Sequence, residues 1–267
     1  MLIGKRGAAT TSISTAAADR ITVRGRDLCA ELMGALNFTE FFFLLATGRM
    51  PTADQSFFLD LALVALAEHG LTPSVQAARM TYAADPAALQ GAVAACVLGC
   101  GTVVLGAARE AGALLEQVLK RIDDGAAPDE AAEATAREHR AAKKPLAGFG
   151  HPLHKPVDPR AERMIALARQ RGIADRGVDA ATRLAAAAAA RVWDKPLPMN
   201  VSMAIAATLR DADIPAAIIR GVPILARAAG LIAHLAEEAE TPIGFTMALQ
   251  AEEAIRYVGP EAGTPNA

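Results

Sequence analysis

Large aromatic side chains are scarce in this sequence of 267 residues, which holds one Trp, two Tyr and eight Phe, or 4% in all. A core built mainly from aromatic rings is therefore excluded. Alanine is abundant instead, at 63 residues, and 52% of the chain is hydrophobic. Because alanine is the best helix former, we expect a mostly helical chain whose backbones approach closely. Its length suits one large domain or two small ones.

Cysteine and net charge are also low, and each absence restricts the class of protein. Three cysteines are too few for a disulfide framework, so we expect a reducing compartment and a cytoplasmic location. The net charge of −2 and the pI of about 6.2 indicate no basic surface for nucleic acid or an anionic membrane. No apolar segment of the secretory type follows the first basic residues. We therefore expect neither nucleic acid nor a membrane as a partner.

Helix boundary signals recur along the chain, whereas strand signals are few. Thr52 begins a capping box with Gln55, and the apolar run that follows stops at Gly70. Only Ile21-Thr22-Val23 has the pattern of a strand, so the sequence predicts an all-α fold with a short N-terminal hairpin. Proline at the first helical position predicts helices that start at residues 73, 86, 128 and 159. We expect other helices to end near residue 124 and to lie near 179–193, 200–211, 215–220, 223–239 and 245–256.

Residues 91–108 contain no charged side chain, and this length would suffice to cross a membrane. The stretch is dominated by Ala and Gly rather than Leu and Ile, which favours a buried helix. Cys96 and Cys100, four residues apart, are most simply small core residues of that helix.

The long non-helical stretch at residues 144–157 is the strongest candidate for a functional loop. Within GFGHPLHKPVDPR (148–160), Gly148 and Gly150 allow main-chain N–H groups close to a ligand, and His151 titrates near neutral pH. Lys155 and Arg160 add positive charge at the start of a helix. The pattern predicts an anion site with an acid or base beside it. A plain Gly/Pro surface loop is an equally open interpretation.

Two other features of the sequence could bind a ligand or a metal ion. His151 and His154 are three apart, but no Cys or carboxylate cluster completes a ligand set, so we expect no metal. Arg227 and His234 share one face of an apolar helix. A charge in such surroundings is either paired or functional.

The 148–160 segment resembles the central motif of the citrate synthase superfamily, in which G-[FY]-G-H is followed by D-P-R. The resemblance continues in order along the chain, which makes it specific. It includes ITVRGRDLCAEL (21–32), FTEFFFLLATGRMPT (38–52), PMNVSMAIAATLRDADIP (198–215) and GVPILARAAGLIAHLAEE (221–238). In its short length the chain looks like the citryl-CoA lyases of the superfamily.

The resemblance implies an all-α fold of two domains with the site in a cleft between them. The large domain would comprise 1–107 and 209–267, and the small domain 108–208. It also implies a homodimer or higher homo-oligomer. No cofactor would be bound, because a coenzyme A thioester is a substrate.

The resemblance also assigns roles to residues of this chain. His151 would hydrogen-bond a carbonyl or hydroxyl oxygen of the substrate, and Arg160 and Arg227 would hold its carboxylates. Lys155 would bind a phosphate of coenzyme A. The backbone of Gly148-Phe149-Gly150 would cradle the adenine end of coenzyme A.

Three positions depart from the family pattern. Val104 stands where the family has a His that stabilises the enol, and Ser202 stands where it has the catalytic Asp. Thr241 stands where a third carboxylate-binding Arg is expected. A neutral Ser cannot take a proton from an acetyl methyl group. We therefore predict cleavage of citryl-CoA or a related 3-hydroxyacyl-CoA, with His151 as base and Ser202 among the groups that hold the enolate.

Two alternatives stay open. One is a condensing enzyme of the citrate synthase type with an unusual base. The other is a catalytically impaired homologue that binds an acyl-CoA or a partner protein.

Overall fold

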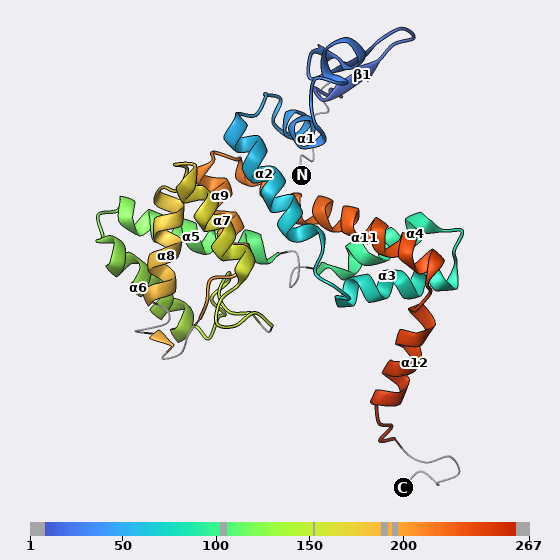
Figure 1. The fold of residues 1–267 in the computed structure, drawn as a ribbon. Helices are drawn as coiled ribbons and strands as arrows, with labels where there is room; N and C mark the ends of the chain where they lie inside the picture. The colour runs from blue at the N-terminus through green and yellow to red at the C-terminus, as the bar shows by residue number, and fades with distance from the viewer. Residues whose placement is uncertain (1–8, 102–105, 152, 188–191, 194–196, 260–267) are drawn as a thin grey trace. The chain divides into compact units, whose positions relative to one another are not determined.

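The computed structural model describes residues 9–101, 106–151, 153–187, 192–193 and 197–259, and these are predominantly helical (Figure 1). The all-α prediction is confirmed. The helices are α1 (Phe38–Thr47), α2 (Ala53–Ala67), α3 (Pro73–Ala84), α4 (Leu89–Gly99), α5 (Ala107–Asp123), α6 (Pro128–Ala141), α7 (Pro159–Gln170), α8 (Arg176–Ala187), α9 (Val201–Asp211), α10 (Ala216–Ile219), α11 (Val222–Glu240) and α12 (Gly244–Ala254).

The expected N-terminal hairpin is present and has a third strand. Strands β1 (Ser14–Ala16), β2 (Ile21–Val23) and β3 (Arg26–Asp27) pair antiparallel in the order β1-β2-β3. Thr15 lies opposite Thr22, and Val23 lies opposite Arg26. A short π-helix, Leu28–Leu32, follows directly.

The chain divides into two compact units. Unit 1 is formed by Met1–Ala65 and Ala107–Val222, and unit 2 by Leu66–Gly106 and Pro223–Ala267. The expected domains and these units share the boundary near residue 107. They differ elsewhere, including at residues 209–222, which were expected in the large domain. Helix α9 packs on α5, α7 and α8, and α10 packs on α9. Residues 209–222 therefore belong with unit 1 by compactness. The expected large and small domains stay a prediction.

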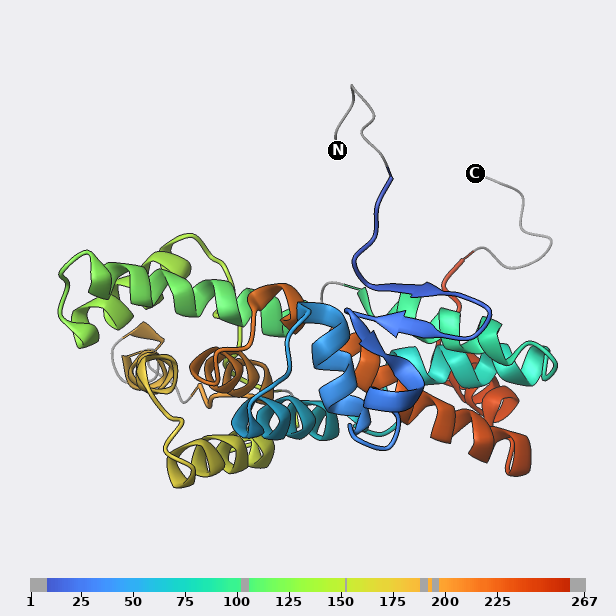
Figure 2. The same ribbon diagram turned by 90° about the horizontal axis from the view of Figure 1, so that it is seen from above.

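Unit 1 holds a layered set of helices around α9. Figure 2 shows α5 and α6 on one side of α8 and α9, and α7 on the other side. Helix α9 is buried nearly all round, from Val201 to Leu209 except at Ser202. Helix α5 buries one stripe, which includes Leu114, Leu115, Val118 and Leu119. The central position of α9 fixes the segment that precedes it, residues 197–200.

Unit 2 contains a core of small side chains between α3, α4 and α11. Cys96 and Cys100 are fully buried there beside Leu231 and Leu235. Burial raises the pKa of the Cys96 thiol, and the nearby Cys100 raises it further. The thiol is therefore neutral near pH 7, and the prediction that these cysteines are core residues is confirmed.

Helix α4 corrects two expectations. It begins at Leu89 rather than at Pro86, because the Asp85 backbone N–H bonds to the Thr81 carbonyl and closes α3 instead. It ends at Gly99, so one buried helix over residues 91–108 is wrong for the described part of that stretch. Leu98 is 82% exposed, although Cys96 on the same helix is buried.

The stretch Ala216–Glu240 is a candidate membrane span by length and composition, since an 18-residue window in it has a mean hydropathy of 1.6, and 28% of that window is buried. A core helix of a soluble protein meets the same criterion. Here Leu231 and Leu235 lie in the core cluster of unit 2.

A buried ion pair joins α3 to α11 in unit 2. Arg79 Nε donates to Glu238 Oε2 over 2.6 Å, and Arg79 Nη1 donates to Glu237 Oε2 over 2.6 Å. The other carboxylate oxygen of Glu238 accepts the backbone N–H groups of Ile243 and Gly244 at the start of α12. Burial would raise the pKa of Glu238, but the hydrogen bonds from Arg79 and from these backbone groups outweigh it and hold the pKa below its ordinary value.

We predict that Glu238→Gln lowers the free energy of unfolding by about 3 kcal/mol at pH 7, since it leaves a buried guanidinium without its buried partner. Glu237→Gln is the matched control. Its side chain is 63% exposed, so the loss stays below about 1 kcal/mol. Denaturant unfolding measures both.

The effect of Glu238 also depends on pH. Because its folded-state pKa is depressed, its contribution is complete above the ordinary pKa of 4.5 and is lost as pH falls through the lower folded value. The stability gap between wild type and Glu238→Gln therefore narrows below pH 4.5. A gap that is the same at pH 7 and at pH 3 would contradict this role.

Candidate active site

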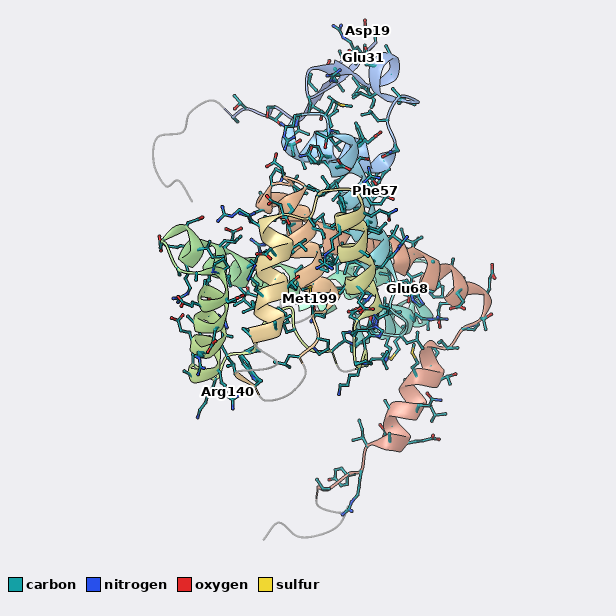
Figure 3. All side chains as sticks on the ribbon, turned by 60° about the vertical axis from the view of Figure 1, so that its left-hand side comes forward. Asp19, Glu31, Phe57, Glu68, Arg140 and Met199 are labelled. Atoms are coloured by element: carbon teal, nitrogen blue, oxygen red, sulfur yellow. The ribbon has the colours of Figure 1, made fainter. Side chains whose placement is uncertain are left out.

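The N-terminus of α9 gathers the predicted loop around one asparagine. The backbone N–H of Asn200 donates to the Gly148 carbonyl over 2.9 Å, and Asn200 Nδ2 donates to the Gly150 carbonyl over 2.9 Å. Asn200 Oδ1 accepts the Ser202 backbone N–H and so caps α9. Phe149 forms an antiparallel bridge with Met199, which Figure 3 labels. The loop therefore keeps a fixed place beside the first turn of α9.

Gly148 is required by both its backbone and its neighbours. Its φ is +85°, and an added Cβ would lie 2.7 Å from Met203 Cβ and 3.0 Å from Ala111 Cβ. Gly150 also has a positive φ, +78°, and its N–H donates to the Pro198 carbonyl over 2.7 Å. The Phe149 N–H donates to Leu146. The expectation that main-chain N–H groups here approach a ligand is therefore wrong for residues 149 and 150, whose N–H groups are bonded within the chain.

Asp158 holds Arg160 and the start of α9 together. Its side chain is fully buried, and its two oxygens accept from Arg160 Nε over 3.1 Å, Arg160 Nη2 over 2.9 Å and the Val201 N–H over 3.0 Å. Burial would raise the pKa of Asp158, but the hydrogen bonds from Arg160 and Val201 outweigh it and hold the pKa below its usual range. Asp158 is therefore ionised near neutral pH. It orients Arg160, whose Nη1 makes no hydrogen bond to the described residues.

His151 is oriented by the loop that follows it. Its Nδ1 accepts the backbone N–H groups of Leu153 over 3.1 Å and His154 over 3.0 Å. In the neutral ring the proton therefore sits on Nε2, which acts as a donor. This geometry disagrees with the prediction of His151 as a base, because the lone pair that could accept a proton already receives two amide N–H groups. The ring stacks on His154, with centroids 4.4 Å apart.

The remaining predicted residues are placed as follows. Ser202 is half-buried in the first turn of α9 and brings no charge to it. Lys155 is exposed. Val104 lies outside the described residues. Thr241 is exposed, and its carbonyl accepts from Arg79 Nη2 over 3.3 Å.

Arg227 belongs to unit 2, on α11. Its Nη1 is buried and makes no hydrogen bond within the described part of the chain. His234, one heptad further along α11, contacts Glu68 through Nε2 over 2.8 Å. Arg160 belongs to unit 1, so the convergence of Arg160 and Arg227 on one pocket stays a prediction.

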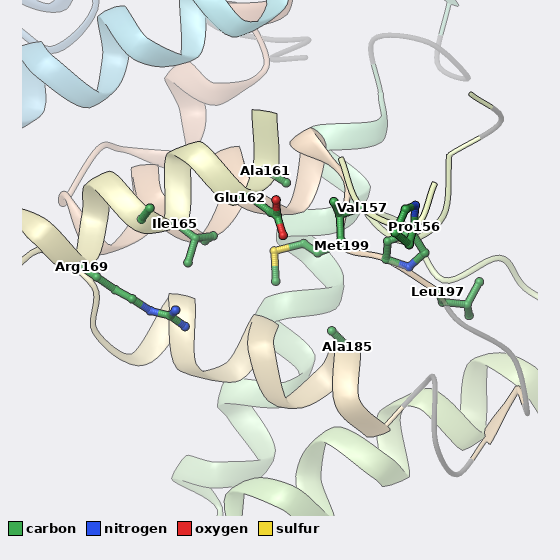
Figure 4. A pocket seen from close by; sticks show the side chains of 11 residues that line it. Pro156, Val157, Ala161, Glu162, Ile165, Arg169, Ala185, Leu197 and Met199 are labelled. Carbon is green, nitrogen blue, oxygen red and sulfur yellow. The ribbon is translucent and has the colours of Figure 1, made fainter. Parts of the chain in front are cut away.

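A pocket of about 510 Å³ opens beside the loop, between α7 and α8. Pro156 and Val157 reach it from the loop, and Met199 reaches it from the segment before α9 (Figure 4). Ile165 and Ala185 complete an apolar wall, and Glu162 and Arg169 are its charged members. The pocket suits an organic ligand with a large apolar or aromatic surface.

Sequence reasoning missed two organising residues of this site. Asp158 precedes Pro159 in the pattern of a helix cap, but its bond to the Val201 N–H joins positions 43 apart and has no local signal. The Asn200 side chain bonds across 50 positions in the same way. Proximity of 148–150 to 198–200 could be found only from the folded chain.

These observations define an all-helical protein with a cationic site built on a helix N-terminus and a glycine–histidine loop. A family model described as "Citrate synthase, C-terminal domain" matches residues 54–244, and the chain belongs to the citrate synthase family.

Three comparisons refine this result. The structure of citryl-CoA lyase from Hydrogenobacter thermophilus is similar with a TM-score of 0.83 and 29% identity, and the match covers 96% of this chain and 97% of that one. ATP citrate lyase from Methanothrix soehngenii, solved with citrate and coenzyme A, has a TM-score of 0.76 and 20% identity over 97% of this chain and 43% of its own, a likeness of fold alone.

The 2-methylcitrate synthase of Shewanella oneidensis is 27% identical over 198 residues, which is 74% of this chain and 50% of that protein. The chain thus spans about half the length of the curated relative that it matches.

We predict that Gly148→Ala destabilises unit 1 more than Gly172→Ala does. Both glycines have a positive φ, so each substitution costs roughly 1–2 kcal/mol of backbone strain. Only at residue 148 does the new Cβ meet packed atoms, and overpacking adds roughly 1–3 kcal/mol. Denaturant unfolding measures the difference. Equal losses at both positions would show that the contact with Met203 and Ala111 does not constrain the loop.

Proposed function

We propose that this protein is a carbon–carbon lyase of the citrate synthase superfamily. It would cleave citryl-CoA or a related 3-hydroxyacyl-CoA into an acyl-CoA and an oxo acid. The likeness to a citryl-CoA lyase along nearly the whole of both chains supports this substrate class.

The observation that carries the proposal is the buried, unpartnered Nη1 of Arg227 within the described residues. A buried guanidinium nitrogen without a partner is costly, and a carboxylate would satisfy it with a charge-assisted hydrogen bond. Arg160 is a second guanidinium, whose Nε and Nη2 bond to Asp158 and whose Nη1 is unengaged by the described residues. Each of these two groups can hold one carboxylate.

Ser202 favours cleavage over condensation. Condensation starts with removal of a carbon-bound proton, and the family's Asp at this position is here a neutral hydroxyl. Cleavage instead generates an enolate that needs hydrogen-bond donors, and the Ser202 hydroxyl on the first turn of α9 can supply one. The positive end of the α9 dipole favours negative charge at the same place.

His151 takes the role of hydrogen-bond donor. Its Nε2–H would donate to the 3-hydroxyl oxygen of the substrate, which becomes the carbonyl oxygen of the oxo acid. A fixed donor of this kind stabilises the charge that develops on that oxygen as the carbon–carbon bond breaks.

Coenzyme A would enter along the glycine–histidine loop. Lys155, exposed next to the pocket that Pro156 and Val157 line, can bind a phosphate. The apolar walls of that pocket suit the adenine ring. The Gly148–Gly150 backbone contributes shape rather than N–H donors.

We also propose that a second copy of the chain covers apolar side chains of unit 2 and that the protein works in the cytoplasm. Leu98, Ile232 and Phe245 are 82%, 55% and 70% exposed, and an apolar surface of this kind is typical of an interface.

A second candidate is an acyl-CoA-binding homologue without turnover. It is favoured by the absence of an available base in the described cluster around α9. The lone pair of His151 Nδ1 is engaged, Asp158 is fully bonded, and Ser202 is neutral.

The deciding experiment incubates the purified protein with citryl-CoA and, separately, with acetyl-CoA plus oxaloacetate. It follows the release of oxo acid in the first mixture and the consumption of oxaloacetate in the second. We expect cleavage to exceed condensation. If neither reaction occurs while citryl-CoA still binds, the result supports the second candidate function, binding of an acyl-CoA without turnover.

We predict that His151→Ala lowers the cleavage rate about a hundredfold or more, the usual scale for a lost catalytic donor. His151→Gln should recover at least about tenfold of that loss, because its amide N–H can donate but cannot act as a base. Steady-state kinetics of both variants measures this. If His151→Gln cleaves citryl-CoA as slowly as His151→Ala does, the result would favour His151 as a base rather than as a hydrogen-bond donor.

We predict that Arg227→Gln weakens citrate binding by about 1.5–3 kcal/mol, the range for hydrogen bonds to charged groups. Arg163→Gln is a matched control, since Arg163 is exposed on α7 and forms no ion pair with the described residues. Isothermal titration calorimetry with citrate measures both. Equal citrate affinities of the two variants would show that Arg227 does not bind a carboxylate of citrate.

A further inference from the structure

A second groove of about 610 Å³ lies within unit 1, apart from the residues assigned above. Helices α5 and α9 form its walls, and the segment from residue 213 to α10 closes it. Its volume falls in the roughly 300–1,000 Å³ range of small-molecule sites. The lining residues are Ala108, Arg109, Gly112, Ala113, Leu115, Glu116, Ala206, Arg210, Asp213, Ile214, Pro215, Ala216, Ile219 and Arg220.

Gly112 is the first indication that the groove is a binding site rather than a packing gap. It lies inside α5, where glycine costs roughly 0.5–1 kcal/mol relative to alanine. Its φ is not in the left-handed region, and an added Cβ would meet only Ala206 Cβ, at 3.9 Å. Neither backbone nor packing therefore requires glycine here. What the missing side chain provides is open space on the α5 wall of the groove.

The charges on the groove leave one cation unmatched. Arg109 pairs with Glu110 over 2.5 Å, and Arg210 pairs with Glu116 over 2.9 Å. Arg220 makes no ion pair or side-chain hydrogen bond to any described residue, and it lines the groove. A ligand with a single negative charge would give Arg220 the ion-pair partner that the other two arginines already have.

The rest of the groove is apolar. Ile214 is buried and Ile219 is half-buried, and both lie on the chain segment that carries Arg220. The alanines of α5 and α10 leave room between these side chains and Gly112. A ligand that satisfies Arg220 can therefore bury an apolar body against the same segment.

From this geometry we infer that the groove is a binding site for a small amphipathic monocarboxylate. The carboxylate pairs with Arg220, and the apolar body lies along Gly112 toward Ile214 and Ile219. A doubly charged phosphate would lack a second unpaired cation, because Glu116 and Asp213, which also line the groove, pair with Arg210 and Arg49. The inference does not depend on the proposed lyase activity, since it uses none of the residues of that site.

The position of the groove along the chain gives its occupancy a means of acting on the rest of the protein. Helix α5 begins at Ala107, where the chain re-enters unit 1, and α10 ends at Ile219, four positions before Pro223, where the chain returns to unit 2. A ligand in the groove contacts both segments. It would therefore restrain the two stretches of chain that lead into unit 2.

The test titrates the full chain with octanoate by isothermal titration calorimetry, with acetate and octan-1-ol as matched probes. Acetate has the carboxylate without the apolar body, and octan-1-ol has the body without the charge. We expect saturable binding of one octanoate per chain, and at least tenfold weaker binding of the other two probes.

Two variants localise the binding. Arg220→Gln should weaken octanoate at least tenfold, and Gly112→Leu should abolish its binding by filling the groove. Gly112→Leu is expected to fold, because leucine is a better helix former than glycine and the Cβ has room. Thermal unfolding verifies this. Arg163→Gln and Arg227→Gln should both bind octanoate as the wild type does.

Absence of octanoate binding, or binding that is unchanged in both Arg220→Gln and Gly112→Leu, overturns the inference. Loss of binding in Arg227→Gln alone would place octanoate at the proposed carboxylate site and overturn it equally. Because no readout requires turnover, failure of the lyase proposal leaves this test intact.

Discussion

The arrangement of the candidate site depends on one buried carboxylate. Asp158 accepts from the guanidinium of Arg160 and from the first backbone N–H of α9, so it connects the end of the histidine loop, the start of α7 and the start of α9. A buried charge is tolerated only when it is paired and hydrogen-bonded. Both oxygens of Asp158 meet that condition, and the same bonds fix the direction in which Arg160 points. The orientation of Arg160 and the bonding of the first N–H group of α9 therefore depend on the same carboxylate.

The small side chains that dominate the composition act at this same place. Gly148 meets Ala111 of α5 and Met203 of α9, and no larger residue at 148 would fit. Close approach of backbones thus holds the loop against two helices without a large aromatic core. The small side chains that take the place of aromatic ones in this composition therefore also allow the loop to lie close to both helices.

Local signals predicted the helices well, because capping acts over three or four residues. The Thr52–Gln55 box forms with both of its bonds, and Pro73, Pro128 and Pro159 each open a helix. The exception is Pro86, where Asp85 ends one helix instead of starting the next.

The site was predictable only in part. The resemblance predicts His151, Arg160 and Arg227 as site residues, and these assignments stay predictions. The orientation of His151 follows from hydrogen bonds that its Nδ1 accepts from two backbone N–H groups, which no sequence pattern encodes. The Arg79–Glu238 pair joins positions 159 apart, and nothing in the sequence distinguishes it from the many surface charges.

The attachment of α12 has a consequence for the helix itself. Of its residues only Gly244 is buried, and a single carboxylate, Glu238, accepts the N–H groups of the N-cap Ile243 and of Gly244. A helix of 11 residues is marginally stable in water by itself, because the cost of nucleation is shared among few turns. If a second copy of the chain covers Phe245 and Leu249, the helix–coil equilibrium of α12 is coupled to self-association. Dilution then lowers helicity and assembly together, and α12 becomes the segment whose backbone amides exchange with solvent first.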